Sequence, residues 1–376
     1  MAMRTVAAAM ALSLAATPSA LRAQERIITT EAGRVRVTTF ASGLVHPWGV
    51  EVLPNGRLIV TERPGRLRLV STAGVVSAPL AGVPAVSAQG QGGLLDVALD
   101  PSFLSTRRVY VCYAEPGAGG TASTAVARGR LTSGALETVQ VIYRQQPKVT
   151  GGAHFGCRLA FARDGRLFVT LGERFTFDPA QDLGVTLGKV ARINPDGSIP
   201  ADNPFVGVAG ARPSIWSYGH RNPQGAAINP RTGALWTAEL GPLGGDEVNI
   251  TLAGRNYGWP LVSWGNNYDG TDIPDPPTRP DLARPIYYWN PSISPSGISF
   301  YTGGAFPAWR GNLFLAALGT QGIVRLGLDG NRVTGEERIG LGARIRDVRP
   351  DPAGRLYLLT DEDAGEVLRL TPVGNW

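Results

Sequence analysis

The stretch Asp164-Gly165-Arg166-Leu167-Phe168-Val169 is a turn with glycine followed by a short strand-like run and a polar exit. The pattern returns in four similar copies and in one looser copy that lacks the glycine: Asn55–Val60, Thr232–Trp236, Gly311–Leu315, Ala353–Leu358 and Thr106–Val111. Consecutive copies are separated by about 43 to 78 residues. Uneven spacing of this kind is typical of repeats whose loops carry insertions on one face.

Short strands bounded by turn residues, without a long stretch of helical periodicity, indicate an all-β protein. Six diverged copies of one strand unit predict a six-bladed β-propeller with four-stranded antiparallel blades around a central channel. The segment Gly365–Leu370 is expected to complete a blade that begins at the N-terminus. The alternative is a pair of packed β-sandwich domains, but no linker-like stretch divides the chain. We therefore expect one catalytic propeller domain over residues 24–376.

The composition supports a folded protein behind a leader segment. Of the 376 residues, 43% are hydrophobic, which allows a large core and excludes disorder for most of the chain. Residues 1–23 combine a basic start with an apolar run from Val6 to Ala16, the pattern of a signal peptide, with cleavage expected after Ala23. The run is too short for a membrane anchor. We expect a periplasmic or secreted protein with no membrane span after cleavage.

The charge is mildly positive. The formal net charge of +6 falls to +4 in the expected mature chain, because Arg4 and Arg22 leave with the leader. Such an excess favours an anionic ligand without requiring one. No cluster of Lys and Arg, and no alternation of basic with aromatic residues, indicates a nucleic-acid partner.

Cys112 and Cys157 are the only cysteines. Export would permit a disulfide between them. Two cysteines do not form a framework from which a pairing can be derived. We expect two separate buried thiols and keep the disulfide as the alternative.

Few side chains can exchange protons near neutral pH, because the only histidines are His46, His154 and His220. His154 follows two glycines and an alanine just before a repeat strand, where it would line a central pocket. A structural histidine is the alternative. His220 shares one turn with Arg221 and Asn222, although a surface ion pair would explain Arg221 equally well.

Several chemistries find no support. The histidines lack the spacing of a zinc site, no Gly-x-Ser-x-Gly elbow is present, and the strand-to-helix context of a dinucleotide fold is missing. The glycine-rich loop Leu240–Asn249 leads to the adjacent acids Asp246 and Glu247. Carbonyls beside carboxylates suit calcium, and a solvated acidic turn is the alternative. The aromatic segment Asn256–Pro295 is long and poor in strand signals, so we expect it to form a wall around a site.

These segments, taken together, resemble the glucose/sorbosone dehydrogenase family of soluble aldose sugar dehydrogenases, which depend on pyrroloquinoline quinone (PQQ). The resemblance begins at Leu44–Gly49 and reaches the last strand. Its most specific segments follow the family's order: Gln91–Leu95, His154–Gly156, Gly219–Gly225, Asn256–Pro260 and Arg344–Val348. The resemblance implies a propeller enzyme that binds PQQ and calcium and oxidises aldose sugars to lactones. Electrons would pass to an external acceptor, and the protein would be a monomer or a homodimer.

The resemblance also implies roles for individual residues. His154 would contact the cofactor and act as the general base on the anomeric hydroxyl of the sugar, while Arg221 would stabilise charge on the quinone carbonyl. The other cofactor contacts would be Gln91, Asn222, Arg344 and Arg346. Calcium bridging to the quinone would bind the carbonyls of Gly241 and Pro242, and a second, structural calcium would bind Asp246, Glu247 and Tyr257. Trp289 and the loop Ser292–Ser296 would flank the pocket.

Two positions depart from the glucose-oxidising branch of the family. That branch has a lysine near Leu318–Gly322, where this chain has no cation, so the resemblance does not support that cofactor contact here. The branch also has an acid immediately before the catalytic histidine, where this chain has Ala153. Both differences indicate one of the broader aldose dehydrogenases.

Two other functions remain open. A calcium-dependent propeller lactonase or other hydrolase would need several carboxylates converging on the metal, whereas the predicted pocket is dominated by arginine. In a non-catalytic binding module that had lost its cofactor, the predicted cofactor-binding residues would have been replaced. Four residues whose replacement this alternative predicts are all present: His154, Arg221, Arg344 and Arg346.

Overall fold

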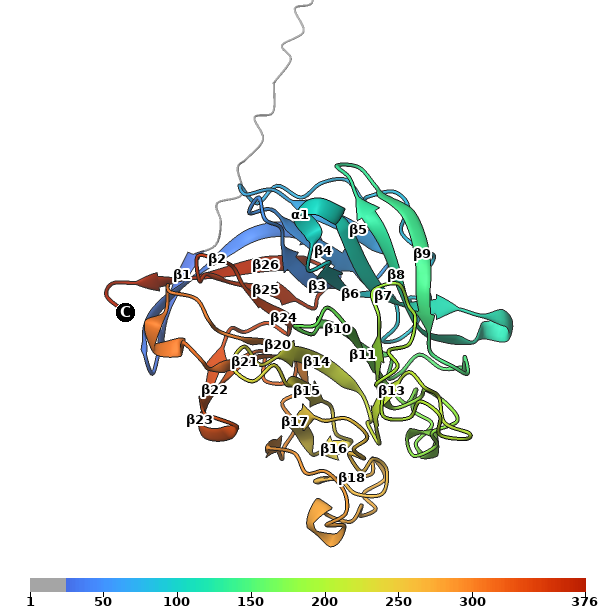
Figure 1. Cartoon of the computed structure of the whole chain (residues 1–376). Helices are drawn as coiled ribbons and strands as arrows, with labels where there is room; N and C mark the ends of the chain where they lie inside the picture. The colour runs from blue at the N-terminus through green and yellow to red at the C-terminus, as the bar shows by residue number, and fades with distance from the viewer. Residues whose placement is uncertain (1–24) are drawn as a thin grey trace, which may run out of the picture.

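The computed structural model describes residues 25–376, so the expected signal peptide (residues 1–23) lies outside the described residues. Six antiparallel sheets surround a central axis and confirm the predicted six-bladed β-propeller (Figure 1). Among residues 25–376, no helix has the length and apolar character needed to cross a membrane.

Four blades have the predicted four strands. From the centre outwards their strands are β6 (Leu94–Leu99), β7 (Arg108–Pro116), β8 (Ala122–Leu131) and β9 (Leu136–Arg144); β10 (Gly156–Phe161), β11 (Leu167–Leu171), β12 (Lys189–Ile193) and β13 (Ile215–Tyr218); β14 (Pro223–Ile228), β15 (Leu235–Glu239), β17 (Asp246–Thr251) and β19 (Tyr287–Trp289); and β20 (Pro295–Phe300), β21 (Leu313–Ala317), β22 (Gly322–Asp329) and β23 (Arg332–Gly340).

The other two blades differ in strand number. One has three strands, β3 (Pro47–Val52), β4 (Leu58–Glu62) and β5 (Arg66–Val70). The other has five, β24 (Ile345–Pro350), β25 (Leu356–Thr360), β26 (Gly365–Val373), β2 (Gly33–Leu44) and β1 (Glu25–Thr30). In the five-stranded blade the N-terminal strand β2 pairs with the C-terminal strand β26, with Val37 opposite Leu370. This pairing confirms the expected closure of the ring.

The sequence repeat corresponds to the second strand of each blade, namely β4, β7, β11, β15, β21 and β25. All five residues of β11 are buried, and the same is true of β4, β15, β21 and β25. A second strand packs between neighbouring blades and therefore needs apolar or small side chains on both faces. The preceding turn needs glycine where φ is positive, as at Gly165 (φ 81°).

The innermost strands form the wall of the channel. In chain order they are β3, β6, β10, β14, β20 and β24, and each contacts the next around the axis. Because every blade repeats the same antiparallel topology, these strands all begin at the same end of the channel. The residues that precede them therefore gather at one mouth.

A disulfide joins two blades. Cys112 in β7 and Cys157 in β10 are bonded, with their Cα atoms 6.1 Å apart. The prediction of two separate thiols is therefore wrong. The cysteines lie 45 residues apart in the sequence, and only the packing of β7 against the next blade brings them together.

The loops contain the remaining elements. The short helices are α1 (Phe103–Thr106), η1 (Ala118–Gly120), η2 (Asp178–Ala180), η3 (Pro276–Thr278) and η4 (Pro307–Trp309). The segment Asn256–Pro295 includes β18 (Gly265–Asn266), which pairs with β16 (Leu243–Gly244), and β19, which pairs with β17 of a blade. It is anchored at both points, so this long segment is an ordered part of the fold.

Candidate active site

Three predicted residues from three blades are in direct contact at one mouth of the channel. Gln91 precedes β6, and its Oε1 atom accepts a hydrogen bond from the backbone N–H of His154 at 2.9 Å. Asn222 precedes β14 and donates to the same Oε1 atom at 3.5 Å. The Oδ1 atom of Asn222 accepts from the backbone N–H of Gly156 at 3.0 Å. The starts of the inner strands are thus linked by side-chain amides.

The ring of His154 is held by a buried carboxylate. Its Nδ1 atom lies 2.6 Å from Oε1 of Glu173, and both side chains are buried. Burial lowers the pKa of His154, the bond to Glu173 opposes that shift, and the charge of Arg221 adds to it. A neutral imidazole that donates from Nδ1 to Glu173 carries its free lone pair on Nε2. This arrangement is that of an oriented base.

Strained backbone is concentrated beside this base. Positive φ angles occur at His154 (51°), Arg174 (63°), Phe175 (61°) and Phe177 (62°). Such conformations are costly for residues other than glycine and persist only where the surroundings impose them.

Arg174 supplies part of that restraint. Its Nε atom donates to the carbonyl of Ala153 at 2.8 Å, its other nitrogens donate to the carbonyls of Gly151 and Ala122, and its guanidinium lies 3.6 Å from the ring centroid of Phe155. Burial lowers the pKa of Arg174 to about 10. This buried cation braces the loop that carries the base.

Aromatic side chains border the mouth. The ring of Phe175 lies 5.0 Å from that of His154 and 6.2 Å from that of Tyr268, between centroids. Phe175 is 45% exposed and Tyr268 is 61% exposed. An exposed aromatic face next to a base suits a ligand that has both polar and apolar surfaces.

Arg221 lies against the loop that was predicted to bind calcium. One guanidinium nitrogen donates to the carbonyls of Gly241 (2.7 Å) and Leu240 (3.2 Å), and the other donates to the hydroxyl of Tyr268 (3.1 Å). The guanidinium also lies 5.1 Å from the ring centroid of Trp259. The interpretation of Arg221 as a surface ion pair is wrong, because the residue is 3% exposed and its bonds are to carbonyls and a hydroxyl.

Arg344 and Arg346 meet at one acid, Asp361. A guanidinium nitrogen of Arg346 lies 2.5 Å from Oδ2 of Asp361, and that of Arg344 lies 3.6 Å from the same atom. Burial alone would raise the pKa of Asp361, but the charge and hydrogen bond of Arg346 outweigh it and lower the pKa to about 2. Arg346 also donates to Gln224 at 2.6 Å, whereas Arg344 is half-exposed. The three groups together carry one excess positive charge.

The side chain of Asp246 does not point to solvent but holds two loops together through hydrogen bonds. Its carboxylate accepts from the backbone N–H groups of Gly241 (2.9 Å), Ile293 (2.8 Å) and Ser294 (2.7 Å), and from the hydroxyl of Ser292 (3.2 Å). Burial raises its pKa, and these hydrogen bonds oppose the shift. Asp246 therefore ties the turn of Gly241 and Pro242 to the loop Ser292–Ser296.

Glu247 and Glu239 line the same small cavity, of about 20 Å³. Asn249 connects them, donating to Glu239 at 3.3 Å and to Glu247 at 3.1 Å. Burial and the neighbouring Glu239 raise the pKa of Glu247 to about 8. Two carboxylates that line one cavity and accept from the same amide fit a bound cation, which would offset their mutual repulsion.

The predicted residues Tyr257 and Trp289 have other partners. Tyr257 lines the same cavity, but its hydroxyl donates to the carbonyl of Ile250 at 2.5 Å, which leaves its backbone carbonyl as the better metal ligand. Trp289 is 2% exposed, belongs to the core between two blades and donates to Glu336 at 3.0 Å. The expectation that its side chain borders the pocket mouth is therefore wrong.

Three acids of the mouth were missed in the sequence: Glu173, Glu239 and Asp361. Each stands at or just after the end of a second strand, and each accepts from a histidine, with Nδ1 distances of 2.6 Å, 3.0 Å and 3.1 Å respectively. The sequence signal was the polar residue at or just after the end of each repeat strand, which is an acid in these three blades. It could have identified the partners of all three histidines.

Comparison with known proteins gives consistent matches over most of the chain. The family model described as "Glucose / Sorbosone dehydrogenase" matches residues 44–369. The aldose sugar dehydrogenase YliI of Escherichia coli is 46% identical over 345 residues, 90% of this chain and 93% of its own length.

Solved structures agree with the sequence matches. A crystal structure of a glucose dehydrogenase shares 51% identity at a TM-score of 0.86, covering 90% of this chain and 99% of the other. The PQQ-bound aldose sugar dehydrogenase of Streptomyces coelicolor shares 28% identity at a TM-score of 0.74, covering 93% and 99% of the two chains.

Proposed function

The chain belongs to the glucose/sorbosone dehydrogenase family of oxidoreductases, and from that premise we propose that it oxidises aldose sugars to lactones using PQQ and calcium. The observation that carries the proposal is the pairing of His154 with Glu173, which leaves one ring nitrogen free at a mouth bordered by arginines. PQQ, when bound, accepts the hydride from the anomeric carbon and later passes electrons to an external acceptor.

His154 would take the proton of the anomeric hydroxyl. Its lowered pKa keeps the ring neutral near pH 7, so Nε2 is available as an acceptor. When the ring becomes charged, the carboxylate of Glu173 stabilises the imidazolium through Nδ1. The exposed rings of Phe175 and Tyr268 would offer the apolar side of the site to the sugar ring.

The residues at the mouth fit a cofactor with three carboxylates. Arg344 and Arg346 would pair with carboxylates, for which the planar guanidinium is suited. Asn222 and Gln91 would contact the polar edge of the rings, and Arg221 would face the carbonyl that is reduced. Arg344 and Arg346 keep one excess positive charge after Asp361 is counted, so their part of the mouth favours an anion.

Two kinds of cation site are proposed. The carbonyls of Gly241 and Pro242 would hold the calcium next to the cofactor, where it would act as a Lewis acid. In the described structure the Gly241 carbonyl accepts from Arg221, so the guanidinium and the ion would share that carbonyl. Glu247 and the backbone of Tyr257 would hold a structural calcium, supported by Asp246 nearby and by Glu239.

A hydrolase is less consistent with the channel. The buried carboxylates deeper in the channel, Asp96 and Asp347, are both paired with Arg158, at 2.9 Å and 3.2 Å. Their oxygens also accept from the backbone N–H groups of Leu159 and Val50, so both carboxylates are already engaged and are poor candidates for ligands of a catalytic metal.

We place the mature protein in the periplasm or outside the cell. The pattern of residues 1–23 supports this location, and so does the disulfide between Cys112 and Cys157, since disulfides persist in oxidising compartments.

Reconstitution tests the proposed function. Protein made in a host without PQQ should be folded and inactive, and PQQ with calcium should restore the reduction of a dye by an aldose. NAD should not substitute. The proposal fails if the protein neither binds PQQ nor oxidises any aldose in a broad panel.

A further inference from the structure

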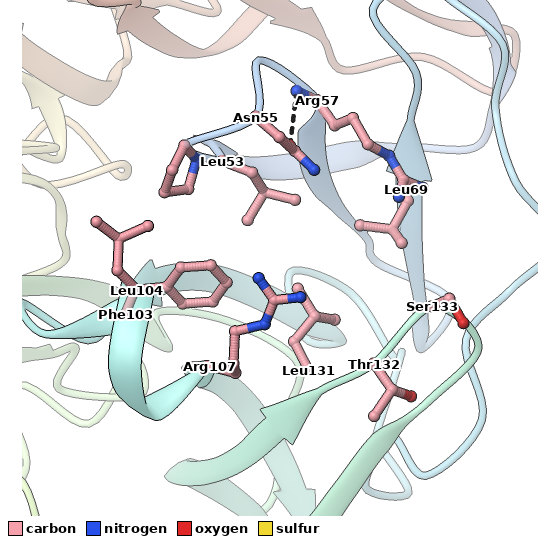
Figure 2. A pocket seen from close by; sticks show the side chains of 11 residues that line it. Leu53, Asn55, Arg57, Leu69, Phe103, Leu104, Arg107, Leu131, Thr132 and Ser133 are labelled. Atoms are coloured by element: carbon pink, nitrogen blue, oxygen red, sulfur yellow. Dashed lines mark hydrogen bonds between the residues drawn. The ribbon is translucent and has the colours of Figure 1, made fainter.

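A crevice lies between the three-stranded blade and the blade of β6 to β9, away from the mouth described above (Figure 2). Its volume is about 320 Å³, which is at the lower end of the size of small-molecule pockets, about 300–1,000 Å³. Its apolar lining consists of Leu53, Leu69, Phe103, Leu104 and Leu131. No residue of the lining is acidic.

Two arginines, Arg57 and Arg107, line this apolar crevice. Figure 2 shows Arg57 beside Leu69 on one side, with Arg107 reaching in from the opposite side next to Phe103. Within residues 25–376, neither guanidinium forms an ion pair or a side-chain hydrogen bond, whereas most other arginines of the fold have an acidic or carbonyl partner. Arg57 is half-buried and Arg107 is exposed, and with no acid in the lining the two guanidinium groups leave the crevice positively charged beside its apolar surface.

Arg107 is fixed in place by its backbone. It caps α1 in the left-handed conformation (φ 54°), its N–H donates to the carbonyl of Phe103 at 2.8 Å, and its own carbonyl accepts from Leu131 at 2.8 Å. Because the conformation is unfavourable for arginine, the geometry is imposed by these bonds. The guanidinium lies 5.9 Å from the ring centroid of Phe103, at the edge of the apolar lining.

We propose that this crevice binds a small amphiphilic carboxylate, such as the anion of a medium-chain fatty acid. The carboxylate would lie between Arg57 and Arg107, and the chain would pack on Phe103 and the leucines. Sugar acids do not fit this description, because a polyol would leave its hydroxyls against an apolar wall.

Octanoate is the probe that tests the site, with binding followed by calorimetry and by saturation-transfer NMR. Wild type should bind it saturably, and the double variant R57Q/R107Q should bind about tenfold or more weakly, since the carboxylate loses both charged partners. Octanol lacks the charge and acetate lacks the chain, so both should bind much more weakly than octanoate. A tryptophan placed at the exposed rim, Ser133→Trp, should block octanoate without any change of charge.

The double variant should fold, because within residues 25–376 neither guanidinium has an ionic or hydrogen-bonding partner, and an unchanged melting temperature and sugar oxidation rate check this. The proposal is overturned if octanoate shows no saturable binding, if octanol binds as well as octanoate, or if R57Q/R107Q binds like wild type. Octanoate binding that Ser133→Trp leaves unaffected would also overturn it, by placing the ligand elsewhere.

A second inference rests on the proposed function and on a different observation, an unassigned cation at the active-site mouth. Arg63 follows β4, and its backbone N–H donates to the carbonyl of His46 at 3.1 Å. One terminal nitrogen donates to the carbonyl of Gly90 at 2.6 Å, next to Gln91. Its Nε atom is buried without a partner. The positive charge of Arg63 acts on Arg346 and Asp361 and contributes to lowering the pKa of each.

We infer that Arg63 is a further contact for a cofactor carboxylate and compensates for the cation that is absent from the loop Leu318–Gly322. Binding of PQQ to the apoprotein in the presence of calcium, followed by quenching of tryptophan fluorescence, tests this without any activity measurement. Arg63→Gln should weaken binding about tenfold, and Arg63→Lys should recover part of the loss because it keeps the charge.

The matched control is Arg332→Gln, which removes the same charge at a side chain that is 73% exposed. If wild type binds PQQ and Arg63→Gln binds as tightly as Arg332→Gln, the role of Arg63 is wrong and the proposed function stands. If wild type binds no PQQ, both are overturned.

Discussion

Nδ1 of His154 lies 2.6 Å from Oε1 of Glu173, and the two side chains reach this contact from the first and second strands of one blade. His154 precedes the inner strand β10, and Glu173 follows β11. The antiparallel pairing of these strands sets Gly156 opposite Leu171, which brings the two flanking residues together. The orientation of the base is thus a consequence of the sheet register.

Replacement of the base should remove catalysis and leave binding. His154→Gln should lower kcat by about 10²-fold or more, because proton transfer by a positioned base contributes at least that much. PQQ affinity and melting temperature should stay close to wild type. A variant with nearly normal turnover would exclude His154 as the base.

Glu173→Gln should alter the pH profile as well as the rate. Since the bond to Glu173 raises the pKa of His154 against the effect of burial, its loss should lower that pKa further. The neutral base then persists to lower pH, so the acid limb of the kcat/KM profile should move to lower pH. The plateau should fall about 10- to 100-fold, because the ring is no longer held. A lower plateau with an unshifted acid limb would contradict this coupling.

Calcium should stabilise the protein most at alkaline pH. Because burial and Glu239 raise the pKa of Glu247 from 4.5 to about 8, the metal-free fold should lose stability as pH rises from about 4.5 through 8. Calcium should restore that loss by balancing the two carboxylates. Melting temperatures measured with chelator and with calcium across this range provide the check.

Glu247→Gln is the matched variant for this effect, because it keeps the shape of the side chain and removes its charge. The metal-free variant should be more stable than metal-free wild type at pH 8, and it should gain little from calcium. Equal calcium stabilisation in the two proteins would place the ion elsewhere.

The disulfide should contribute to stability. Closing a loop of this size restricts the unfolded chain by about 4 kcal/mol in the loop-entropy model, and the bond joins cysteines 45 residues apart. The double variant Cys112→Ser/Cys157→Ser should therefore have a clearly lower melting temperature than wild type, measured under non-reducing conditions. Wild type with added reductant should move towards the variant, and an identical melting temperature in all samples would contradict the prediction.

Charge reversal at Arg344 should weaken cofactor binding severely. Arg344 is half-exposed and 3.6 Å from Asp361, so Arg344→Glu places a second negative charge beside that acid and against the cofactor carboxylates. PQQ titration of the apoprotein should show at least about a 10²-fold loss, since an attractive charge pair becomes a repulsive one. Arg344→Gln should lose less, which separates repulsion from the simple loss of a contact.

Much of the fold could be predicted, because the sequence repeat corresponds to the second strand of each blade, which is the most constrained strand. A second strand is buried on both faces, so its apolar pattern and glycine turn survive divergence, as β4 and β25 show. Strand number varies at the outer edges, where fewer contacts constrain the sequence. The three-stranded blade and the additional strand β1 were therefore not predicted.

The site was predicted in part for a similar reason. Residues immediately before inner strands converge by symmetry, which explains the contact between Gln91, His154 and Asn222. The pairing of Cys112 with Cys157 depends on how one blade packs against the next, which no local pattern reports. Three of the four hydrogen bonds to Asp246 come from a loop more than forty residues away, so its anchoring role could not be predicted either.

The pairing of β2 with β26 makes completion of the chain a condition for the pocket to exist. Residues of the mouth come from blades spread between Arg63 and Asp361, and the last strand of the ring ends only at Val373. During synthesis, an emerging chain therefore exposes the open edges of β2 and β25 until its final residues are released. A fragment that stops before β26 would contain nearly every residue of the mouth and still have no closed ring to hold them in place.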